Sequence, residues 1–275
     1  MRVTVLGSGS SGNATLVEAG GVRVLVDAGF SGRDLAERMT MAEIAPESLD
    51  AILITHDHGD HTRGMGVLAR RFGIPLYLTG RTAVACAKLL NGRETLRFYQ
   101  AERVVRFGTL EVQPFLTVHD AADPVAVTLR DTETGCKLGI ATDLGRPTAA
   151  VRAALASCHL LILEANHDDA LLWQGPYPWS VKQRIASSHG HLSNRAAAEL
   201  AAELHHPALG AVVLAHLSEH CNHADLAASV IGDTLARLRY RGALTVAGPA
   251  APLEPIDVMT LRRRVGATSE QLTLL

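Results

Sequence analysis

The chain has 275 residues, 47% of them hydrophobic and 20% charged, so it carries enough apolar material for one large layered domain or two small ones. Its formal net charge of −2 rules out a general attraction for polyanions, so contact with nucleic acid would need a local basic patch or bound cations. The first residues lack the long apolar stretch of a signal peptide, and no segment approaches the length of a membrane span. We therefore expect a cytoplasmic protein without a membrane contact.

The cysteines indicate the same compartment. They are widely scattered and form no C-x-x-C pair, which favours small buried thiols over a disulfide framework. They are Cys86, Cys136, Cys158 and Cys221.

The predicted elements begin with short strands and continue with alternating strands and helices. The first strands are Arg2–Leu6, Thr15–Glu18 and Val22–Val26, separated by the Gly/Ser-rich Gly7–Asn13 and by Gly20-Gly21. The strand Ala51–Ile54 ends in a histidine cluster and is followed by the helix Gly64–Arg71, the strand Pro75–Leu78 and the helix Arg81–Leu90. The next strands are Val104–Phe107, Leu110–Val118, Val125–Leu129, Cys136–Ala141 and His159–Glu164, with a helix at Thr148–Ala156. The last elements are helices at Val181–Ser187, Asn194–Leu204 and Ala224–Arg239 and strands at Ala211–Ala215 and Ala243–Val246.

Strands in two groups with helices outside them predict an α/β fold of four layers, an αββα sandwich in which helices cover the outer face of each sheet. No linker divides the chain. We expect one catalytic domain over residues 1–261, ending near the proline-rich Pro249–Pro255, and a C-terminal tail over residues 262–275.

A dense group of metal-ligating side chains lies at the junction between a buried strand and a helix. In the pattern H-x-H-x-D-H, four candidate ligands fall within six residues: His56, His58, Asp60 and His61. A loop entering a helix can direct the first two ligands one way and the last two another, which serves two metals better than one. Solvent-facing polar residues would be the ordinary explanation of a polar loop, but the pattern is too specific for that.

With this motif the chain resembles the metallo-β-lactamase fold superfamily, and the resemblance implies further site residues in a fixed order. Each has a match at or just beyond the end of a predicted strand: the supporting acid Asp27, the third histidine His119, the bridging Asp143 and the last histidine His216. The resemblance implies His56, His58 and His119 on one metal and Asp60, His61 and His216 on the other, with Asp143 between them. Asp27 would orient the ligand loop without binding metal.

Two divalent cations are therefore the expected cofactors, zinc or manganese, with iron as an alternative at the carboxylate-rich second site. Two adjacent cations would lower the pKa of a shared water from 15.7 towards about 7, and the resulting bridging hydroxide is the expected nucleophile. Asp60 and Asp143 are thus assigned to catalysis as well as to metal binding.

The metal motif does not choose between thioesters, lactones, β-lactams and phosphodiesters. Beyond it, the chain resembles small hydrolases of the WalJ/YycJ type up to about Val246, through Leu6–Ala14, Glu164–Asp168, Gly175–Ile185 and Gly190–Asn194. This resemblance implies a phosphodiesterase acting on nucleic acid, with DNA exonuclease activity and with DNA favoured over RNA. No long basic arm of the kind that clamps RNA is visible, which weakens a role in tRNA processing.

Several residues outside the ligand set are candidates for contact with the substrate. His191 precedes a helix whose N-cap is predicted to be Ser193, and it could donate a proton to the departing alkoxide, as the resemblance to tRNA-processing relatives implies. Asn166 and His167 are further candidates. The backbone of Ser8–Asn13 could bind phosphate, although a tight strand connection explains that loop equally well.

An aromatic cluster stands out in a chain whose aromatic content is only 4%. It comprises Trp173, Tyr177 and Trp179, next to Lys182 and Arg184. These side chains either stack bases while the cations hold phosphates, with Trp179 as a substrate contact, or pin a loop to the body of the protein.

Two alternative functions remain open at this stage. A thioester hydrolase of the glyoxalase II kind would carry the same T-H-x-H-x-D-H motif without needing His191, and a non-catalytic nucleic-acid-binding module could use the same fold. The terminal Gln271–Leu275 is similar to short peptides that bind the sliding clamp, although a packed terminal element explains it as well. The oligomeric state is not predicted.

Overall fold

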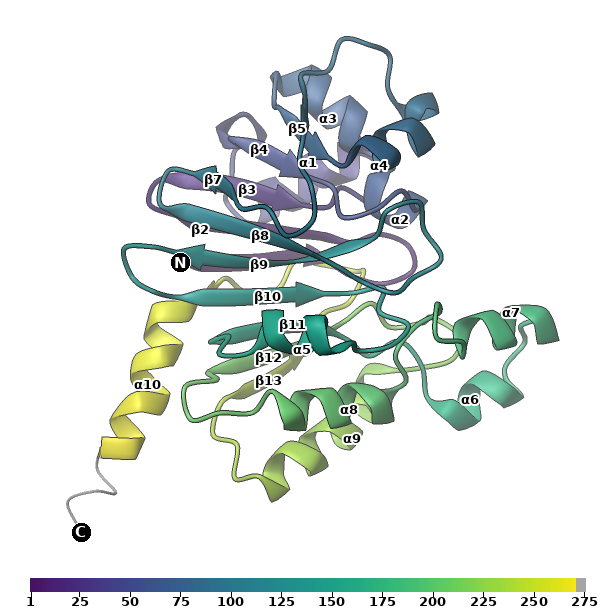
Figure 1. Cartoon of the computed structure of the whole chain (residues 1–275), viewed down its shortest axis with the longest axis vertical. Coiled ribbons are helices and arrows are strands. Elements are labelled where there is room, and N and C mark those ends of the chain that lie inside the picture. The colour runs from purple at the N-terminus through teal and green to yellow at the C-terminus, as the bar shows by residue number, and fades with distance from the viewer. Residues whose placement is uncertain (271–275) are drawn as a thin grey trace.

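Two mixed sheets pack face to face in the computed structural model, which describes residues 1–270 and the side chains of residues 1–265 (Figure 1). The first sheet has the order β14 (Ile256–Asp257), β1 (Arg2–Gly7), β2 (Ala14–Ala19), β3 (Val22–Val26), β4 (Ala51–Leu53), β5 (Leu76–Leu78) and β6 (Leu96–Phe98). The second has the order β13 (Ala243–Val246), β12 (Ala211–Ala215), β11 (Leu160–Glu164), β10 (Lys137–Ala141), β9 (Val125–Asp131), β8 (Leu110–Leu116) and β7 (Val105–Phe107).

Helices cover the outer faces of both sheets, which confirms the predicted αββα sandwich. The first sheet is covered by α1 (Gly32–Met41) and α3 (Met65–Phe72), and the second by α5 (Ala149–Leu155), α8 (Asn194–Glu203) and α9 (Ala224–Arg237). The remaining helices are α2 (Gly59–Thr62), α4 (Gly80–Ala85), α6 (Asp169–Gln174), α7 (Trp179–Ile185), α10 (Val258–Glu270) and the short 3₁₀ turns η1 (Pro46–Ser48) and η2 (Ala87–Leu89). Among the described residues, no helix combines the length and the apolar character needed to cross a membrane.

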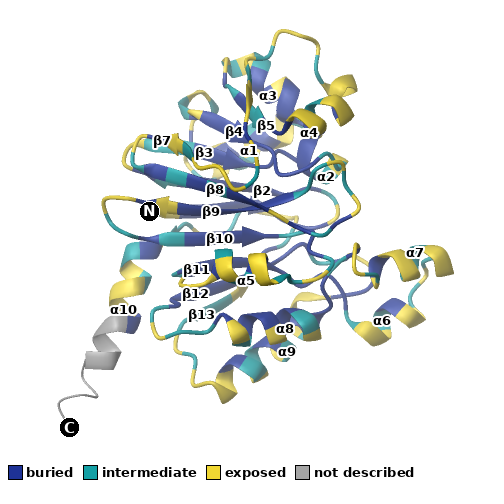
Figure 2. Ribbon diagram, viewed as in Figure 1, coloured by how far each residue is buried: buried dark blue, intermediate teal, exposed yellow. Residues whose placement is uncertain are grey.

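The main core lies between the sheets, where Val24 and Leu53 of the first sheet share one apolar cluster with Val127 and Ile162 of the second. Strands β4, β11 and β12 in the interior of the sheets are buried along their whole length (Figure 2). This double burial explains why β4, β11 and β12 are almost continuously apolar in sequence instead of alternating. The four cysteines are free and buried, as predicted.

Strand direction places the functional loops at one edge of the sandwich. Strands β3 to β6 run parallel in the first sheet, and β10 to β13 run parallel in the second. Strand β8 runs the same way as β10 because both are antiparallel to β9. Residues that follow β3, β4, β8, β10, β11 and β12 therefore leave the sheets at corresponding ends, the usual position of a binding site in an open sheet with parallel strands.

The predictions missed α1, α6, the edge strands β6 and β14, and α10. Helix α10 crosses the boundary predicted at residue 262, and its Val258 and Val265 are buried against the body of the protein. Residues 262–270 therefore belong to a helix and not to a tail. This helix directly follows β14, which pairs with β1 at the edge of the first sheet. The proposed clamp-binding peptide Gln271–Leu275 lies outside the described residues and stays a prediction.

The packing of α10 predicts that the C-terminal segment contributes to stability. A chain ending at Glu254 should lose at least about 2 kcal/mol of unfolding free energy, since it lacks the buried side chain of Val258 and since β1 loses its edge partner β14. A chain ending at Glu270 should keep the stability of the full chain. Urea denaturation of the three proteins measures both effects, and equal midpoints for all three would contradict the assignment.

Candidate metal centre

The seven predicted ligands converge at the edge where the parallel strands end. One ligand atom from each of His56, His58, His119 and Asp143 lies within 4.8 Å of the others. A second group with the same spacing comprises Asp60, His61 and His216. The ligands come from the ends of β4 and β8, β10 and β12, so both sheets contribute to each group.

Asp143 lies between the two groups. Its Oδ2 is 3.0 Å from His61 Nε2, and its Oδ1 is 3.6 Å from both His119 Nε2 and His216 Nε2. The carboxylate of Asp143 thus lies close to histidines of both groups, which is the position expected of a bridging ligand.

The histidines of the first group are oriented by oxygen acceptors outside the cluster. His56 Nδ1 lies 3.0 Å from Thr55 Oγ1, and His119 Nδ1 lies 3.0 Å from the carbonyl oxygen of Gly190. His58 is turned the other way, because its Nε2 lies 3.2 Å from the carbonyl oxygen of Asp120. An acceptor on one ring nitrogen holds the hydrogen there and leaves the lone pair of the other nitrogen for a metal. His56 and His119 therefore present Nε2, and His58 presents Nδ1.

Two buried atoms show that the donor set fits cations. His56 Nε2 and Asp143 Oδ2 are buried, face the cluster and form no hydrogen bond, and Oδ2 has only the ion-pair contact with His61 Nε2 at 3.0 Å. An unpaired buried polar atom is costly unless something binds it. Imidazole nitrogens together with carboxylate oxygens are the donors that zinc, manganese and iron accept, so the residues present suit two divalent cations.

Asp27, the predicted support of the ligand loop, lies beneath that loop. It follows β3 and is buried, and its carboxylate accepts hydrogen bonds from the Thr55 amide and hydroxyl groups at 2.8–3.0 Å. It also lies 2.8 Å from His61 Nδ1, which directs His61 Nε2 towards the cluster. Asp27 thus connects Thr55, at the start of the ligand loop, to the ligand His61 through hydrogen bonds.

Glu164 has the equivalent position in the second sheet, and no function was predicted for it. It ends β11, is fully buried, and accepts hydrogen bonds from His216 Nδ1 at 2.9 Å and from His191 Nδ1 at 2.8 Å. It also accepts from the backbone amides of Asp143, Leu144 and Leu192 at 2.9–3.2 Å. The signal in the sequence was a carboxylate at the end of the apolar strand Leu160–Glu164, whereas Asp27 was predicted from the family resemblance.

Three residues of the site have a backbone conformation that L-amino acids rarely adopt. Asp27, Asp143 and His216 have φ angles of 62°, 57° and 55°. Such a conformation costs about 1–3 kcal/mol per residue and persists only where the surrounding structure enforces it. Asp27 and His216 come directly after β3 and β12, and Asp143 follows β10 by two residues. The turn directs Asp143 and His216 into the cluster and Asp27 towards the ligand loop.

The charges in the cluster stabilise one another. Burial alone would raise the pKa of Asp143, but the charges of His216 and His61 hold it well below its usual range. Burial would likewise lower the pKa of His216, yet Asp143 and the hydrogen bond to Asp60 raise it to about 10. The pKa of Glu164 falls to about 2 despite its burial, mainly because of His191. Burial lowers the pKa of His56. The carboxylates are therefore ionised at neutral pH, as metal ligands must be.

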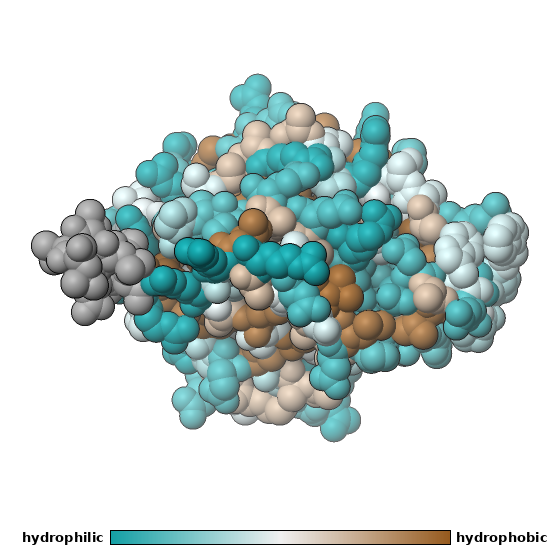
Figure 3. Space-filling view, turned by 90° about the horizontal axis from the view of Figure 1, so that it is seen from below, coloured by the Kyte–Doolittle hydropathy of each residue, from teal (hydrophilic) through white to brown (hydrophobic). Residues whose placement is uncertain are grey.

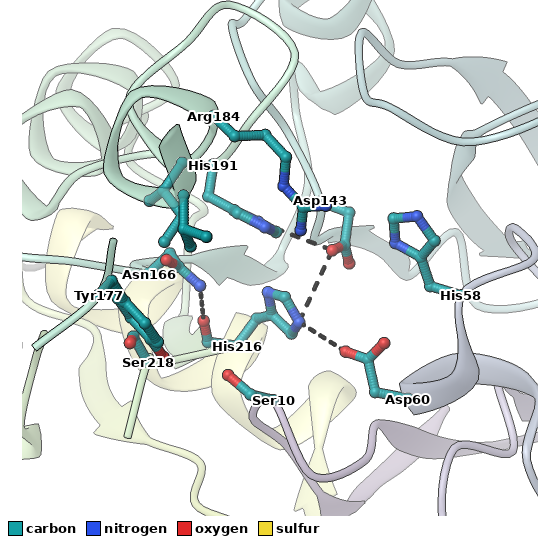
Figure 4. A pocket seen from close by; sticks show the side chains of 12 residues that line it. Ser10, His58, Asp60, Asp143, Asn166, Tyr177, Arg184, His191, His216 and Ser218 are labelled. Atoms are coloured by element: carbon teal, nitrogen blue, oxygen red, sulfur yellow. Dashed lines mark hydrogen bonds and ion pairs between the residues drawn. The ribbon is translucent and has the colours of Figure 1, made fainter. Parts of the chain in front are cut away.

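A cavity of about 270 Å³ opens onto the cluster (Figure 4). His58, Asp60, Asp143 and His216 form its metal-binding side, and His191 lines it beside them. The rest of its wall is formed by Ser10, Asn166, Tyr177, Val181, Arg184, Ile185 and Ser218. His191 lies next to the predicted ligands, and with Asp143, Glu164 and His216 it forms a third group whose ligand atoms lie within 4.8 Å of one another, so its role as a residue outside the ligand set stays a prediction.

The other predicted substrate contacts differ in their access to this cavity. Asn166 lines it, with its amide nitrogen donating to the carbonyl oxygen of His216 at 2.9 Å. His167 and Ser193 are buried and do not line it; Ser193 is the N-cap of α8, as predicted, and its hydroxyl accepts from the Ala196 amide. Trp179 lies away from the cavity and is 65% exposed. All four assignments stay predictions.

The Ser8–Asn13 loop acts mainly as a structural connection. Its Ser8, Gly9, Gly12 and Asn13 amides all donate to acceptors within the protein. Ser8 Oγ accepts from the His216 amide at 2.8 Å, and the Asn13 side-chain nitrogen lies 3.2 Å from His61 Nε2. The loop therefore links the two halves of the site, which favours the strand-connection interpretation over phosphate binding.

Comparison with known proteins agrees with this geometry. Residues 22–217 match the model of the beta-lactamase superfamily domain. Over 86% of its length the chain is 34% identical to exodeoxyribonuclease YycJ of Bacillus anthracis, covering 89% of that protein, and to exodeoxyribonuclease WalJ of Streptococcus pneumoniae, covering 88%. It is also 34% identical over 46% of its length to ribonuclease Z of a Mycobacterium species, covering 48% of that protein.

Solved structures show the same fold. The metallo-β-lactamase fold protein YhfI of Bacillus subtilis superposes with a TM-score of 0.70 at 20% identity, covering 92% of this chain and 98% of that one. The short form of human tRNase Z superposes with a TM-score of 0.66 at 19% identity, covering 92% and 99%.

The close packing at Gly29 predicts a sensitive position behind the ligand loop. A Cβ atom there would lie 1.7 Å from the carbonyl oxygen of Asp60, so Gly29→Ala must displace that loop. We expect about 1–3 kcal/mol of lost stability and weaker metal binding. Gly59→Ala is the matched control, because a Cβ atom at Gly59 meets nothing within 4 Å. Thermal unfolding and metal titration of both variants check this, and equal behaviour would contradict it.

The bridging position of Asp143 predicts a defect in metal binding without unfolding. Asp143→Asn keeps the shape of the side chain but removes the charge between two cations, which would then repel each other. Purified variant should hold fewer than two metals per chain by elemental analysis, and its turnover should fall by at least about 100-fold, the upper range for loss of a mere supporting residue. Retention of two metals with near-normal turnover would show that Asp143 is not the bridge.

Proposed function

Since the chain belongs to the beta-lactamase superfamily and is a metal-dependent hydrolase, we propose that it cleaves phosphodiester bonds in nucleic acid and that its substrate is DNA rather than RNA. The relatives that it matches over 86% of its length carry the name exodeoxyribonuclease, whereas the ribonuclease Z match covers 46%. An exonuclease acting on DNA is therefore the favoured form of the activity.

The observation that carries this proposal is the position of His191 beside two groups of metal ligands. His56, His58 and His119 would hold one cation and Asp60, His61 and His216 the other, with Asp143 between them. When bound, two such cations activate a water molecule at neutral pH and withdraw charge from a phosphoryl oxygen. A thioester or lactone needs nothing more, but a nucleic-acid phosphodiester also has a leaving alkoxide that requires a proton.

The surroundings of His191 support the proposal that it donates this proton. Its Nδ1 lies 2.8 Å from Glu164 Oε1, so this nitrogen carries the ring hydrogen that faces the protein interior. The other nitrogen, Nε2, is the one available to a substrate in the cavity. A buried carboxylate behind an imidazole fixes the orientation and the tautomer of the ring. Glu164 thereby serves as a positioning residue for both His191 and the ligand His216.

The four buried thiols also support our proposal that the protein works in the cytoplasm, since free cysteines persist in a reducing compartment.

The proposed role of His191 predicts a leaving-group effect. His191→Ala should bind both metals normally, yet cleave DNA about 10²–10⁴-fold more slowly, the usual contribution of a positioned acid. Hydrolysis of bis-p-nitrophenyl phosphate should fall far less, because p-nitrophenolate departs without a proton. Steady-state kinetics of both substrates, with metal content as the control, make the comparison.

Two results would contradict parts of this proposal. An equal loss on both substrates would mean that His191 binds phosphate instead of donating a proton. A wild-type protein that hydrolyses a glutathione thioester, with no effect of His191→Ala on any ester, would remove the phosphodiesterase assignment itself.

A further inference from the structure

Helices α6 and α7, with the turn between them, form an arm over residues 169–185 that projects from the sandwich (Figures 1 and 3). The arm carries Trp173 and Trp179, the only tryptophans in the sequence. Their side chains are 43% and 65% exposed, and their ring centroids lie 5.1 Å apart. The alternative in which buried aromatics pin this segment to the body is therefore wrong for both indoles. Exposed aromatic rings grouped on a projection mark a surface for binding.

The arm is held in place from beneath. Leu172, Ile185 and Cys221 form a small buried cluster, against which Tyr177 and Val181 pack. The Lys182 ammonium group donates to the carbonyl oxygen of Trp173 at 2.7 Å and so ties α7 to α6. The indoles are thus presented by an anchored pair of helices.

The opposite side of the arm forms part of the cavity over the metal ligands. Tyr177, Val181, Arg184 and Ile185 all line that cavity with His191 and Asp143. Arg184 Nε lies 3.4 Å from Asp120 Oδ2, which places its guanidinium group near the ligand loop while leaving it 63% exposed. The same arm therefore carries a cation at the cavity and two exposed indoles outside it.

The charge of the arm fits a nucleic-acid strand. Lys182 and Arg184 lie on the same helix as Trp179, and the acidic Asp169 on α6 has Arg195 as a partner at 3.8 Å. Trp179 and Arg184 are five residues apart on α7, about 7.5 Å along a helix axis at about 1.5 Å per residue. Five residues also turn a helix by about 140°, so Arg184 lies on the side of the cavity and Trp179 on another side of α7.

We propose that this arm binds unpaired nucleotides next to the scissile phosphate, with Trp173 and Trp179 stacking on bases and with Lys182 and Arg184 contacting the backbone. Within a duplex the faces of each base are covered by its neighbours, so an indole can stack only on a base at an end or in a single strand. The arm would thus select single-stranded ends for the nuclease activity. This inference rests on the proposed function and specifies its substrate.

Intrinsic fluorescence tests the inference directly, because both tryptophans of the chain lie on the arm. The full-length protein, with divalent metal removed by a chelator so that nothing is cleaved, is titrated with a single-stranded oligodeoxynucleotide and with the blunt duplex of the same sequence. We expect saturable quenching by the single strand and a weaker response to the duplex.

Variants then assign the binding to the indoles. By anisotropy of a labelled oligonucleotide, Trp173→Ala and Trp179→Ala should each weaken single-strand binding by about 5- to 100-fold, the range for loss of one stacking partner. Phe98→Ala is the matched control, since Phe98 is an aromatic residue with 64% exposure on β6, outside the arm, and its loss should change nothing. With metal restored, each tryptophan variant should lower kcat/KM for the oligonucleotide relative to that for bis-p-nitrophenyl phosphate, mainly through KM.

Several outcomes would overturn the inference. Absent quenching, tryptophan variants that bind like the wild type, or an equal preference for the duplex would each exclude an arm that binds unpaired bases. A wild-type dimer that either tryptophan substitution converts to a monomer in sedimentation would assign the surface to a second copy of the chain. Quenching and tryptophan-dependent binding without cleavage of any nucleic acid by the metal-loaded protein would instead refute the proposed function and leave the binding arm standing.

Discussion

The metal centre depends on two buried carboxylates, one at the end of a strand in each sheet. Asp27 accepts a hydrogen bond from Nδ1 of His61, and Glu164 accepts one from Nδ1 of His216. A buried negative charge is tolerated only where hydrogen bonds compensate for its lost hydration. Glu164 obtains this compensation from two imidazoles and three backbone amides, so the charge is stable only when the loops after β10, β11 and β12 are all in place. The hydrogen bonds that orient His216 therefore form only when these three loops have folded.

The same constraint explains the unusual backbone at the site. Asp27, Asp143 and His216 adopt left-handed conformations within two residues of the ends of their strands, at a cost of about 1–3 kcal/mol each. The double burial of the strands supplies the stability that offsets this cost, since their side chains pack both between the sheets and under the outer helices. In return, ligands from both sheets point into one volume without long flexible connections. The result is a centre that is formed before substrate arrives, which is the condition for efficient electrostatic catalysis.

Next to this centre lies the α6–α7 arm, whose two helices are short and largely exposed to solvent. The α6–α7 arm shares only a small buried cluster with the body, yet it contributes a third of the residues that line the cavity wall. A division of this kind lets the sandwich fix the chemistry while a small peripheral element selects the substrate. It also accounts for the ease with which one metal motif serves phosphodiesters, thioesters and lactones in different proteins of the same fold.

The sequence by itself predicted the layered architecture and the candidate ligands His56–His61, because continuous apolar strands and the spacing of these residues are local signals, whereas His119, Asp143 and His216 were predicted from the resemblance to the metallo-β-lactamase fold. It did not determine the partners of those ligands. Glu164 and His216 are separated by 52 positions, and only the alignment of β11 beside β12 brings them together. Nor could it decide whether Trp173 and Trp179 are buried, or that α10 continues past residue 262, since in both cases the answer is set by which distant surface the side chains meet. Local sequence patterns indicate which residues can take part in the site. How these side chains are oriented is decided by burial and by hydrogen bonds between remote segments, because these contacts form only when the two sheets pack against each other.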